Sequence, residues 1–146
     1  AGLFAEAGLS ISKAALREKN TGPGGCNSEF LRENATVSTI LVSDEPDQSY
    51  QAGPSVTWSS VVSDLLTAAP STYISAVAGP VPDGCPTASP GTGYAEAAAA
   101  TGGIFVNICS RDWGEKMAQL AEQAATVDLL SGGRLDFGVG KGYRAN

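Results

Sequence analysis

The sequence predicts an α/β fold: a three-layer sandwich in which helices cover both faces of a mostly parallel sheet. Helical and strand-like patterns alternate strictly along the chain, which implies parallel strands joined by right-handed crossovers. The strand-like segments are continuous apolar runs, such as ILV at 40–42, which suit strands covered on both faces. With 146 residues, 42% of them hydrophobic, the chain is expected to form a single domain, 1–146, with its own core.

The elements follow from periodicity and from helix start and stop signals. Ser55 is expected to cap one helix that ends before Pro70, and Gly102 and Gly103 are typical residues at the end of another. In chain order we expect a helix over 3–19, a Gly/Pro loop over 20–29, a strand over 35–43, a polar loop over 45–54, a helix from Ser55 to about Ala68, a strand over 72–78, a short helix over 93–100, a strand over 104–109, a long helix that starts after Ser110 or Asp112 and ends before Ser131, and a short strand over 134–140.

Charge and composition exclude several classes of function. The net charge of -6 argues against a nucleic-acid partner, because a phosphate backbone needs a basic surface. No apolar run approaches the ~20 residues of a membrane span, so no membrane partner is expected. Histidine is absent, which removes the usual neutral-pH base and the commonest zinc ligand. Any bound metal should therefore be a hard ion that prefers oxygen ligands.

Three carboxylates follow the strand over 35–43: Asp44, Glu45 and Asp47. Ligands of open α/β sheets bind beyond the carboxyl ends of the strands. Like charges placed close together repel one another, and a divalent cation such as Mg²⁺, Ca²⁺ or Mn²⁺ would hold them together. We therefore predict a metal site here, with Ser43 and Ser49 as possible hydroxyl ligands. A solvated acidic loop remains the alternative.

The three cysteines, Cys26, Cys85 and Cys109, lack the short spacing of a metal site. Cys85 lies in a Pro/Gly loop and Cys109 ends an apolar run. A disulfide between Cys85 and Cys109 and three reduced thiols are both consistent with this pattern.

The remaining candidates have simpler explanations. Asp83 is expected in a turn, Asp112 at a helix N-cap, and both tryptophans, Trp58 and Trp113, in a core or interface. The stretch GVGKG at 138–142, with Lys141 and Arg144 as cations, lacks the spacing of a phosphate-binding loop.

Most of the chain resembles the C-terminal half of a von Willebrand factor type A domain, in particular those of bacterial secreted or envelope proteins. The resemblance covers about residues 5–122 and rests on FLRENATVSTILVSDEPDQS, SVTWSSVVSDLL, STYISAVAGPVPDGCP and GTGYAEAAAATGGIFVNICSRDWGEKMAQLA. It implies a doubly wound sheet and an adhesion-type Mg²⁺ site in which Asp44 matches one ligand. The Asp-x-Ser-x-Ser stretch of that site does not occur in this sequence, so a complete site is not expected in one copy.

The end of the chain, AEQAATVDLLSGGRLDFGVGKGYRAN, resembles a segment of luciferase-like flavin-dependent monooxygenases. Those enzymes are (β/α)₈ barrels of roughly 250 residues, so no flavin is expected here. The chain therefore resembles a chimera of two truncated domains.

A type A half-domain would expose the edge of the strand over 35–43, which is an aggregation hazard unless it is covered. The strand at 134–140 could pair with that edge, or two copies could join edge to edge. We expect a homodimer, with swapped tails as one form, which could also bring two acidic loops together.

Two classes of function fit these observations. The first is a divalent-metal-binding or structural domain without evolved catalysis, whose ligand the sequence does not identify. The alternative is a metal-assisted hydrolase of activated esters or phosphoesters, in which the ion lowers the pKa of a water and Glu45 or Asp47 acts as base.

Overall fold

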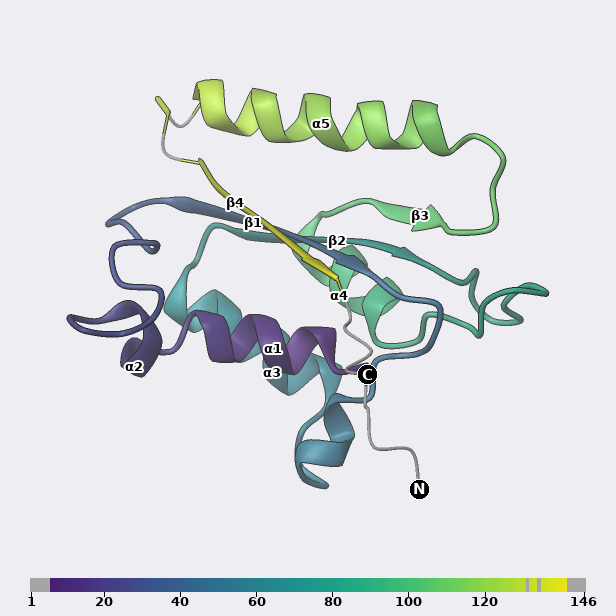
Figure 1. Ribbon diagram of the computed structural model, residues 1–146, viewed down its shortest axis with the longest axis horizontal. Coiled ribbons are helices and arrows are strands. Elements are labelled where there is room, and N and C mark those ends of the chain that lie inside the picture. Colours follow the sequence, from purple (N-terminus) through teal and green to yellow (C-terminus); the bar gives the residue numbers. More distant parts are fainter. Residues whose placement is uncertain (1–5, 131, 134, 142–146) are drawn as a thin grey trace.

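The protein is a three-layer α/β sandwich around one four-stranded parallel sheet, as expected from the sequence (Figure 1). The computed structural model describes residues 6–130, 132–133 and 135–141. The strands lie in the order β3-β2-β1-β4. Helix α5 covers one face of the sheet, and α1, α3 and α4 cover the other (Figure 1). No helix among the described residues is long and apolar enough to cross a membrane.

The strands lie close to their predicted positions. The strand expected over 72–78 matches to the residue, and the strand expected over 104–109 is shorter than predicted. Their bounds are β1 Thr36–Val42, β2 Thr72–Ala78, β3 Phe105–Asn107 and β4 Leu135–Lys141.

The helices show two departures from prediction. The helix expected over 3–19 is divided, because the backbone leaves the helical conformation at Leu16 and Arg17. A short 3-10 helix also forms inside the loop expected over 45–54. The helices are α1 Gly8–Ala15, α2 Glu18–Thr21, η1 Ser49–Ala52, α3 Trp58–Ala68, α4 Tyr94–Thr101 and α5 Trp113–Leu130.

Helix α3 begins later than predicted because Thr57, rather than Ser55, is its N-cap. The Ser60 N–H donates to the Thr57 hydroxyl over 3.2 Å, and the Thr57 N–H donates to the Ser60 hydroxyl over 3.0 Å. This reciprocal pair satisfies two amide groups that a helix start leaves open. Two other predicted helix boundaries hold: Gly102 ends α4 with φ of 71°, and the Asp112 carbonyl accepts from the Lys116 N–H at the start of α5.

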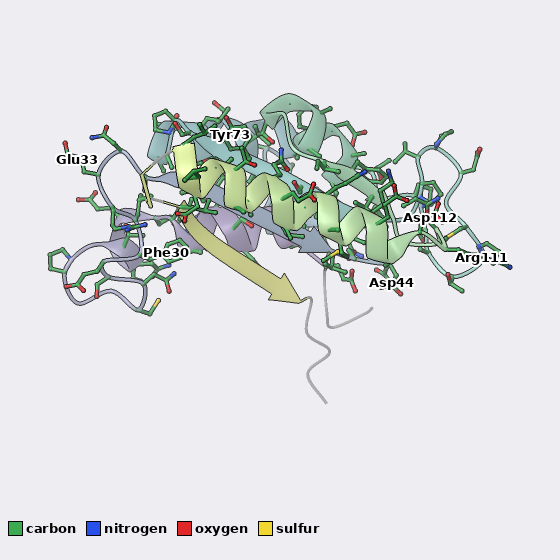
Figure 2. The ribbon with its side chains drawn as sticks, turned by 90° about the horizontal axis from the view of Figure 1, so that it is seen from above. Phe30, Glu33, Asp44, Tyr73, Arg111 and Asp112 are labelled. Atoms are coloured by element: carbon green, nitrogen blue, oxygen red, sulfur yellow. A yellow bond between two sulfur atoms is a disulfide. The ribbon has the colours of Figure 1, made fainter. Side chains whose placement is uncertain are left out.

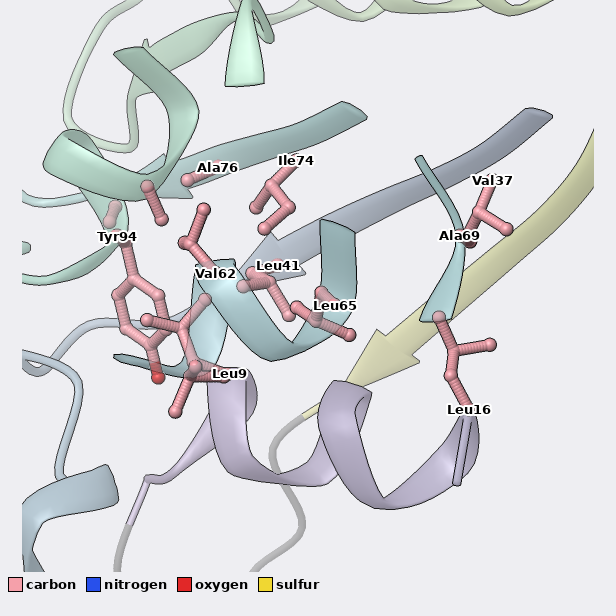
Figure 3. Packing of buried hydrophobic residues seen from close by; sticks show 13 residues of the cluster. Leu9, Leu16, Val37, Leu41, Val62, Leu65, Ala69, Ile74, Ala76 and Tyr94 are labelled. Carbon is pink, nitrogen blue, oxygen red and sulfur yellow. The ribbon is translucent and has the colours of Figure 1, made fainter. Parts of the chain in front are cut away.

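The larger part of the core lies between the sheet and the helices α1, α3 and α4 (Figure 3). Each of these helices contributes fully buried side chains to it, among them Leu9, Leu65 and Tyr94. Trp58 packs against this core while remaining partly exposed, as expected for a core-facing tryptophan. We call this cluster the large core.

The face under α5 is covered more thinly. Among the side chains that the structure describes, the buried ones there are Ile40, Val77, Val106 and Leu120, and of these only Leu120 comes from the helix. At the end of α5, Leu129 and Leu130 are each 81% exposed. We call this cluster the small core. The side chain of Trp113, at the start of α5, lies outside the described part of the structure.

The edge of β1 that a half-domain would expose is covered within one chain. Strand β4 pairs with β1 in parallel along its whole length, from Thr36 opposite Leu135 to Val42 opposite Lys141. Residues 138–141 of the GVGKG stretch therefore lie inside a strand and form no phosphate-binding loop, which needs a turn between strand and helix. Arg144 lies outside the described residues.

Candidate functional site

Three loops meet beyond the carboxyl ends of β1, β2 and β3, at the edge of the sheet where ligands of this architecture bind. We call this region the rim; Asp44, Arg111 and Asp112 mark this end of the molecule in Figure 2. The rim loops are residues 43–48, 79–93 and 108–112.

Backbone hydrogen bonds join the first two rim loops. The Ser89 N–H donates to the Asp44 carbonyl over 2.8 Å, and the Asp47 N–H donates to the Thr92 carbonyl over 2.9 Å. The second loop also folds tightly on itself: a Cβ added at Gly79 would lie 1.9 Å from the Ser89 carbonyl oxygen. Only glycine fits at this position, so the close approach of the two parts of this loop depends on Gly79.

A disulfide joins the second rim loop to the third. It links Cys85 to Cys109 across 24 residues of sequence, and the Thr87 hydroxyl lies 3.5 Å from the Cys109 sulfur. Of the two states that the sequence left open, the structure contains the disulfide. Cys26 is free and exposed.

Between the first two rim loops lies an open depression of about 460 Å³. Its charged side chains are Asp44, Glu45 and Asp83, and residues 85–90 form the remaining wall. Asp83 belongs to the turn before Gly84, which has φ of 72° and so confirms the turn expected there. Because its described lining includes three carboxylates and no cation, the depression favours a positively charged ligand.

Asp47 does not share this depression, because it faces the start of helix α1. Its carboxylate accepts from the Leu9 N–H over 3.3 Å and from the Ser49 hydroxyl over 2.9 Å. The first amide groups of a helix carry a partial positive charge and need acceptors. Asp47 therefore supplies a side-chain acceptor at this helix end, where the preceding residue Ala7 offers no side-chain cap.

Two further side chains complete this helix start. The Gly8 N–H donates to the Tyr94 hydroxyl over 3.2 Å, and the Ser10 N–H donates to the Ser49 hydroxyl over 3.0 Å. The Tyr94 hydroxyl in turn donates to the Glu6 carbonyl over 3.0 Å. We call this set of contacts the α1 anchor.

Burial dominates the electrostatics of the α1 anchor. It raises the pKa of Asp47 above 3.8, although hydrogen bonds from Ser49 and Leu9 act in the opposite direction. Burial likewise raises the pKa of Tyr94 to about 12, with a smaller contribution from the negative charge of Asp47. Tyr94 therefore stays a neutral hydroxyl at any physiological pH.

Glu6, which the sequence did not suggest as a site residue, contacts the first rim loop. Its carboxylate accepts a hydrogen bond from the hydroxyl of Ser43, and that hydroxyl also accepts from the Glu45 N–H over 3.1 Å. The sequence gives little indication of this contact, because Glu6 is a single acidic residue in the apolar opening segment and is distant in sequence from Ser43.

The expected constellation of Asp44, Glu45 and Asp47 is thus divided between the depression and the α1 anchor. Within the part of the chain that the structure describes, no group of three Asp, Glu, Cys or His side chains is placed to hold a metal ion. The hydroxyl ligands considered earlier are also engaged, Ser43 with Glu6 and Ser49 with helix α1.

Comparison of the chain with protein-family models, with curated proteins and with solved structures finds no match.

Proposed function

We propose that the protein is a non-enzymatic binding domain, related to the type A domains, whose ligand surface is the acidic depression of the rim. The observation that supports this is the placement of Asp44, Glu45 and Asp83 around an open hollow at the carboxyl edge of a parallel sheet. Two of the loops are bonded backbone to backbone and the third is tied by the disulfide. A surface held in this way loses little conformational entropy when it binds.

The ligand that we propose is a hydrated divalent cation, Mg²⁺ or Ca²⁺. Because the described carboxylates form no group that could hold a bare ion, the ion would keep most of its water and bind weakly. Mg²⁺ commonly binds proteins in this way, through one or two carboxylates. Asp44 and Asp83 come from different loops, so an ion between them would relieve their mutual repulsion.

The test is an NMR titration with Mg²⁺ and Ca²⁺, together with Mn²⁺ as a paramagnetic probe. We expect Mn²⁺ to broaden the amide signals of residues 43–45 and 83–85 first, with a dissociation constant on the order of millimolar. In the variant D44N/D83N, Mn²⁺ should no longer broaden the signals of these residues before the others. The variant E115Q/E122Q removes the same charge from exposed positions of α5. In this control, Mn²⁺ should still broaden the signals of residues 43–45 and 83–85 first.

Two results would contradict the proposal. Equal broadening of all acidic surfaces would show that the depression is no site. Metal-dependent turnover of an activated ester or phosphoester, abolished in D44N/D83N, would favour the hydrolase instead. Of the two carboxylates considered as base, Glu45 lines the depression, whereas Asp47 belongs to the α1 anchor.

A further inference from the structure

The outer part of the second rim loop, residues 81–87, extends beyond the carboxyl end of β2 (Figure 1). We call this segment the tip. It carries Asp83, whereas the other two carboxylates of the depression, Asp44 and Glu45, belong to the first rim loop. The tip is largely exposed, since five of its seven residues are exposed and two are half-buried. Packing against the rest of the molecule therefore contributes little to its position.

The tip is connected to the rest of the molecule through Cys109. Its backbone bonds stay within the second rim loop, as in the bond from the Cys85 N–H to the Ala88 carbonyl over 2.8 Å. Among the described residues, the covalent and hydrogen-bond contacts that leave this loop from the tip are the Cys85–Cys109 disulfide and the contact of the Thr87 hydroxyl with the Cys109 sulfur over 3.5 Å. Both contacts end at Cys109. The disulfide therefore determines where Asp83 lies relative to the first rim loop.

We propose that this disulfide is a reducible site for a dithiol and that its redox state regulates the cation site, which itself rests on the function proposed above. Cys85 and Cys109 are both half-buried, so a dithiol in solution reaches their sulfur atoms. One thiolate of the dithiol attacks a sulfur of the disulfide and forms a mixed disulfide, which the second thiol then resolves. The S–S bond of the protein breaks, two electrons and two protons pass to the two cysteines, and the dithiol becomes a disulfide itself.

Reduction releases the tip from Cys109. Asp83 then moves away from Asp44 and Glu45, because like charges repel one another. A cation that binds between the two loops must bring Asp83 back and order the tip again, and this loss of conformational freedom weakens binding. We expect the dissociation constant for the cation to rise by about ten-fold on reduction. Because coupling between two sites is reciprocal, the bound cation should lower the equilibrium constant for reduction by the same factor.

The first measurement is the Mn²⁺ titration by NMR, repeated on oxidised and reduced chains. The variant C26S provides the background, because it removes the free exposed thiol and keeps the disulfide. Reduction with dithiothreitol, followed by removal of the dithiol under nitrogen, gives the reduced chain, and C26S/C85S/C109S gives a chain that cannot form the bond. In oxidised C26S, the signals of residues 43–45 and 83–85 should broaden at an Mn²⁺ concentration about ten-fold lower than in the other two chains. The signals of α3 should be the same in all three, since the large core does not include the disulfide.

The second measurement is the equilibrium between C26S and dithiothreitol, with and without Mg²⁺. Trapping of the free thiols with iodoacetamide, followed by mass spectrometry, gives the fraction of reduced protein. At saturating Mg²⁺ the equilibrium constant for reduction should fall by about ten-fold. Na⁺ at the same ionic strength is the control, because it screens the carboxylates without bridging them. Equilibria are compared rather than rates, because a cation also changes how fast an anionic thiolate approaches an acidic surface.

These measurements separate the redox coupling from the cation site itself. If oxidised C26S shows no selective broadening, the cation site is absent and the coupling is overturned with it. If oxidised and reduced chains broaden alike, and Mg²⁺ leaves the equilibrium constant for reduction unchanged, the cation site stands and the coupling alone is overturned. Loss of the α3 signals on reduction also overturns the coupling, because the disulfide would then hold the whole fold rather than the tip.

Discussion

The two faces of the sheet are built differently. On one face, α1, α3 and α4 bury side chains in the large core, and the α1 anchor fixes the start of the first helix. On the other face α5, the longest helix, buries Leu120 alone among its described side chains.

This difference indicates where stability resides. Burial of apolar surface is the main favourable term in folding and scales roughly with area. The large core should therefore govern global unfolding. Because α5 buries fewer of its described side chains, we expect it to open locally without disrupting the large core. The three predictions that follow test this contrast, from the largest expected effect to the smallest.

The largest effect is expected from Leu65→Ala in α3. Leu65 is 2% exposed and packs within the large core (Figure 3). Removing its side chain leaves a cavity between helix and sheet and should lower the free energy of unfolding by about 4 kcal/mol. Denaturation with urea, followed by circular dichroism, measures this change. Ser63→Ala, at an exposed position of the same helix, should stay within about 0.5 kcal/mol of wild type.

A smaller effect is expected from Leu120→Ala in α5. Leu120 is 3% exposed, but among the described side chains of α5 it is the one that is buried in the small core. We expect a loss of about 2 kcal/mol, at the low end for a buried leucine, because few neighbours hold the cavity open. Gln119→Ala serves as the exposed control.

Hydrogen exchange separates local from global effects in this variant. Amides of α5 should exchange much faster in Leu120→Ala while those of α3 change little, because α5 can open without disrupting the large core. A loss as large as that of Leu65→Ala, with equal changes in both helices, would show that the two faces unfold as one unit.

The sequence predicts strands better than it predicts the site. The strand over 72–78 was predicted to the residue because an apolar run with β-branched residues lies between Pro70 and Gly79. The start of α3 was misplaced because PSVTWSS offers several capping residues. Only the reciprocal bonds of Thr57 and Ser60 decide between them.

The directions of the rim carboxylates could not be predicted. In sequence, Asp44, Glu45 and Asp47 share one loop, and adjacency suggests one site. The partner of Asp47 is the Leu9 amide, 38 positions earlier, and which helix end a loop approaches depends on tertiary packing. The covered edge of β1 was predicted as one of two alternatives, because the alternating pattern of 135–139 suits a strand in either a monomer or a dimer.

The smallest effect is expected from Asp47, and it tests whether the α1 anchor contributes to the stability of the large core. Asp47→Ala removes the acceptor of the Leu9 N–H and should lower the free energy of unfolding by about 1 kcal/mol, as the loss of a helix cap does. Asp47→Asn keeps an oxygen at this position and should cost less. Urea denaturation of both variants at a fixed pH measures the two losses.

The dependence of stability on pH separates the effect of the charge of Asp47 from the effect of its hydrogen bonds. Burial raises the pKa of Asp47 in the folded protein above 3.8, so its contribution to stability is greatest below pH 3.8 and falls as pH rises through the raised pKa. Asp47→Asn lacks this titration, so the stability of Asp47→Asn relative to wild type should increase between pH 3.8 and neutrality. If its relative stability decreases instead, the ionised carboxylate at the start of α1 stabilises the protein by more than its burial costs. The α1 anchor would then be an electrostatic cap, and the stability of this face would depend on charge as well as on burial.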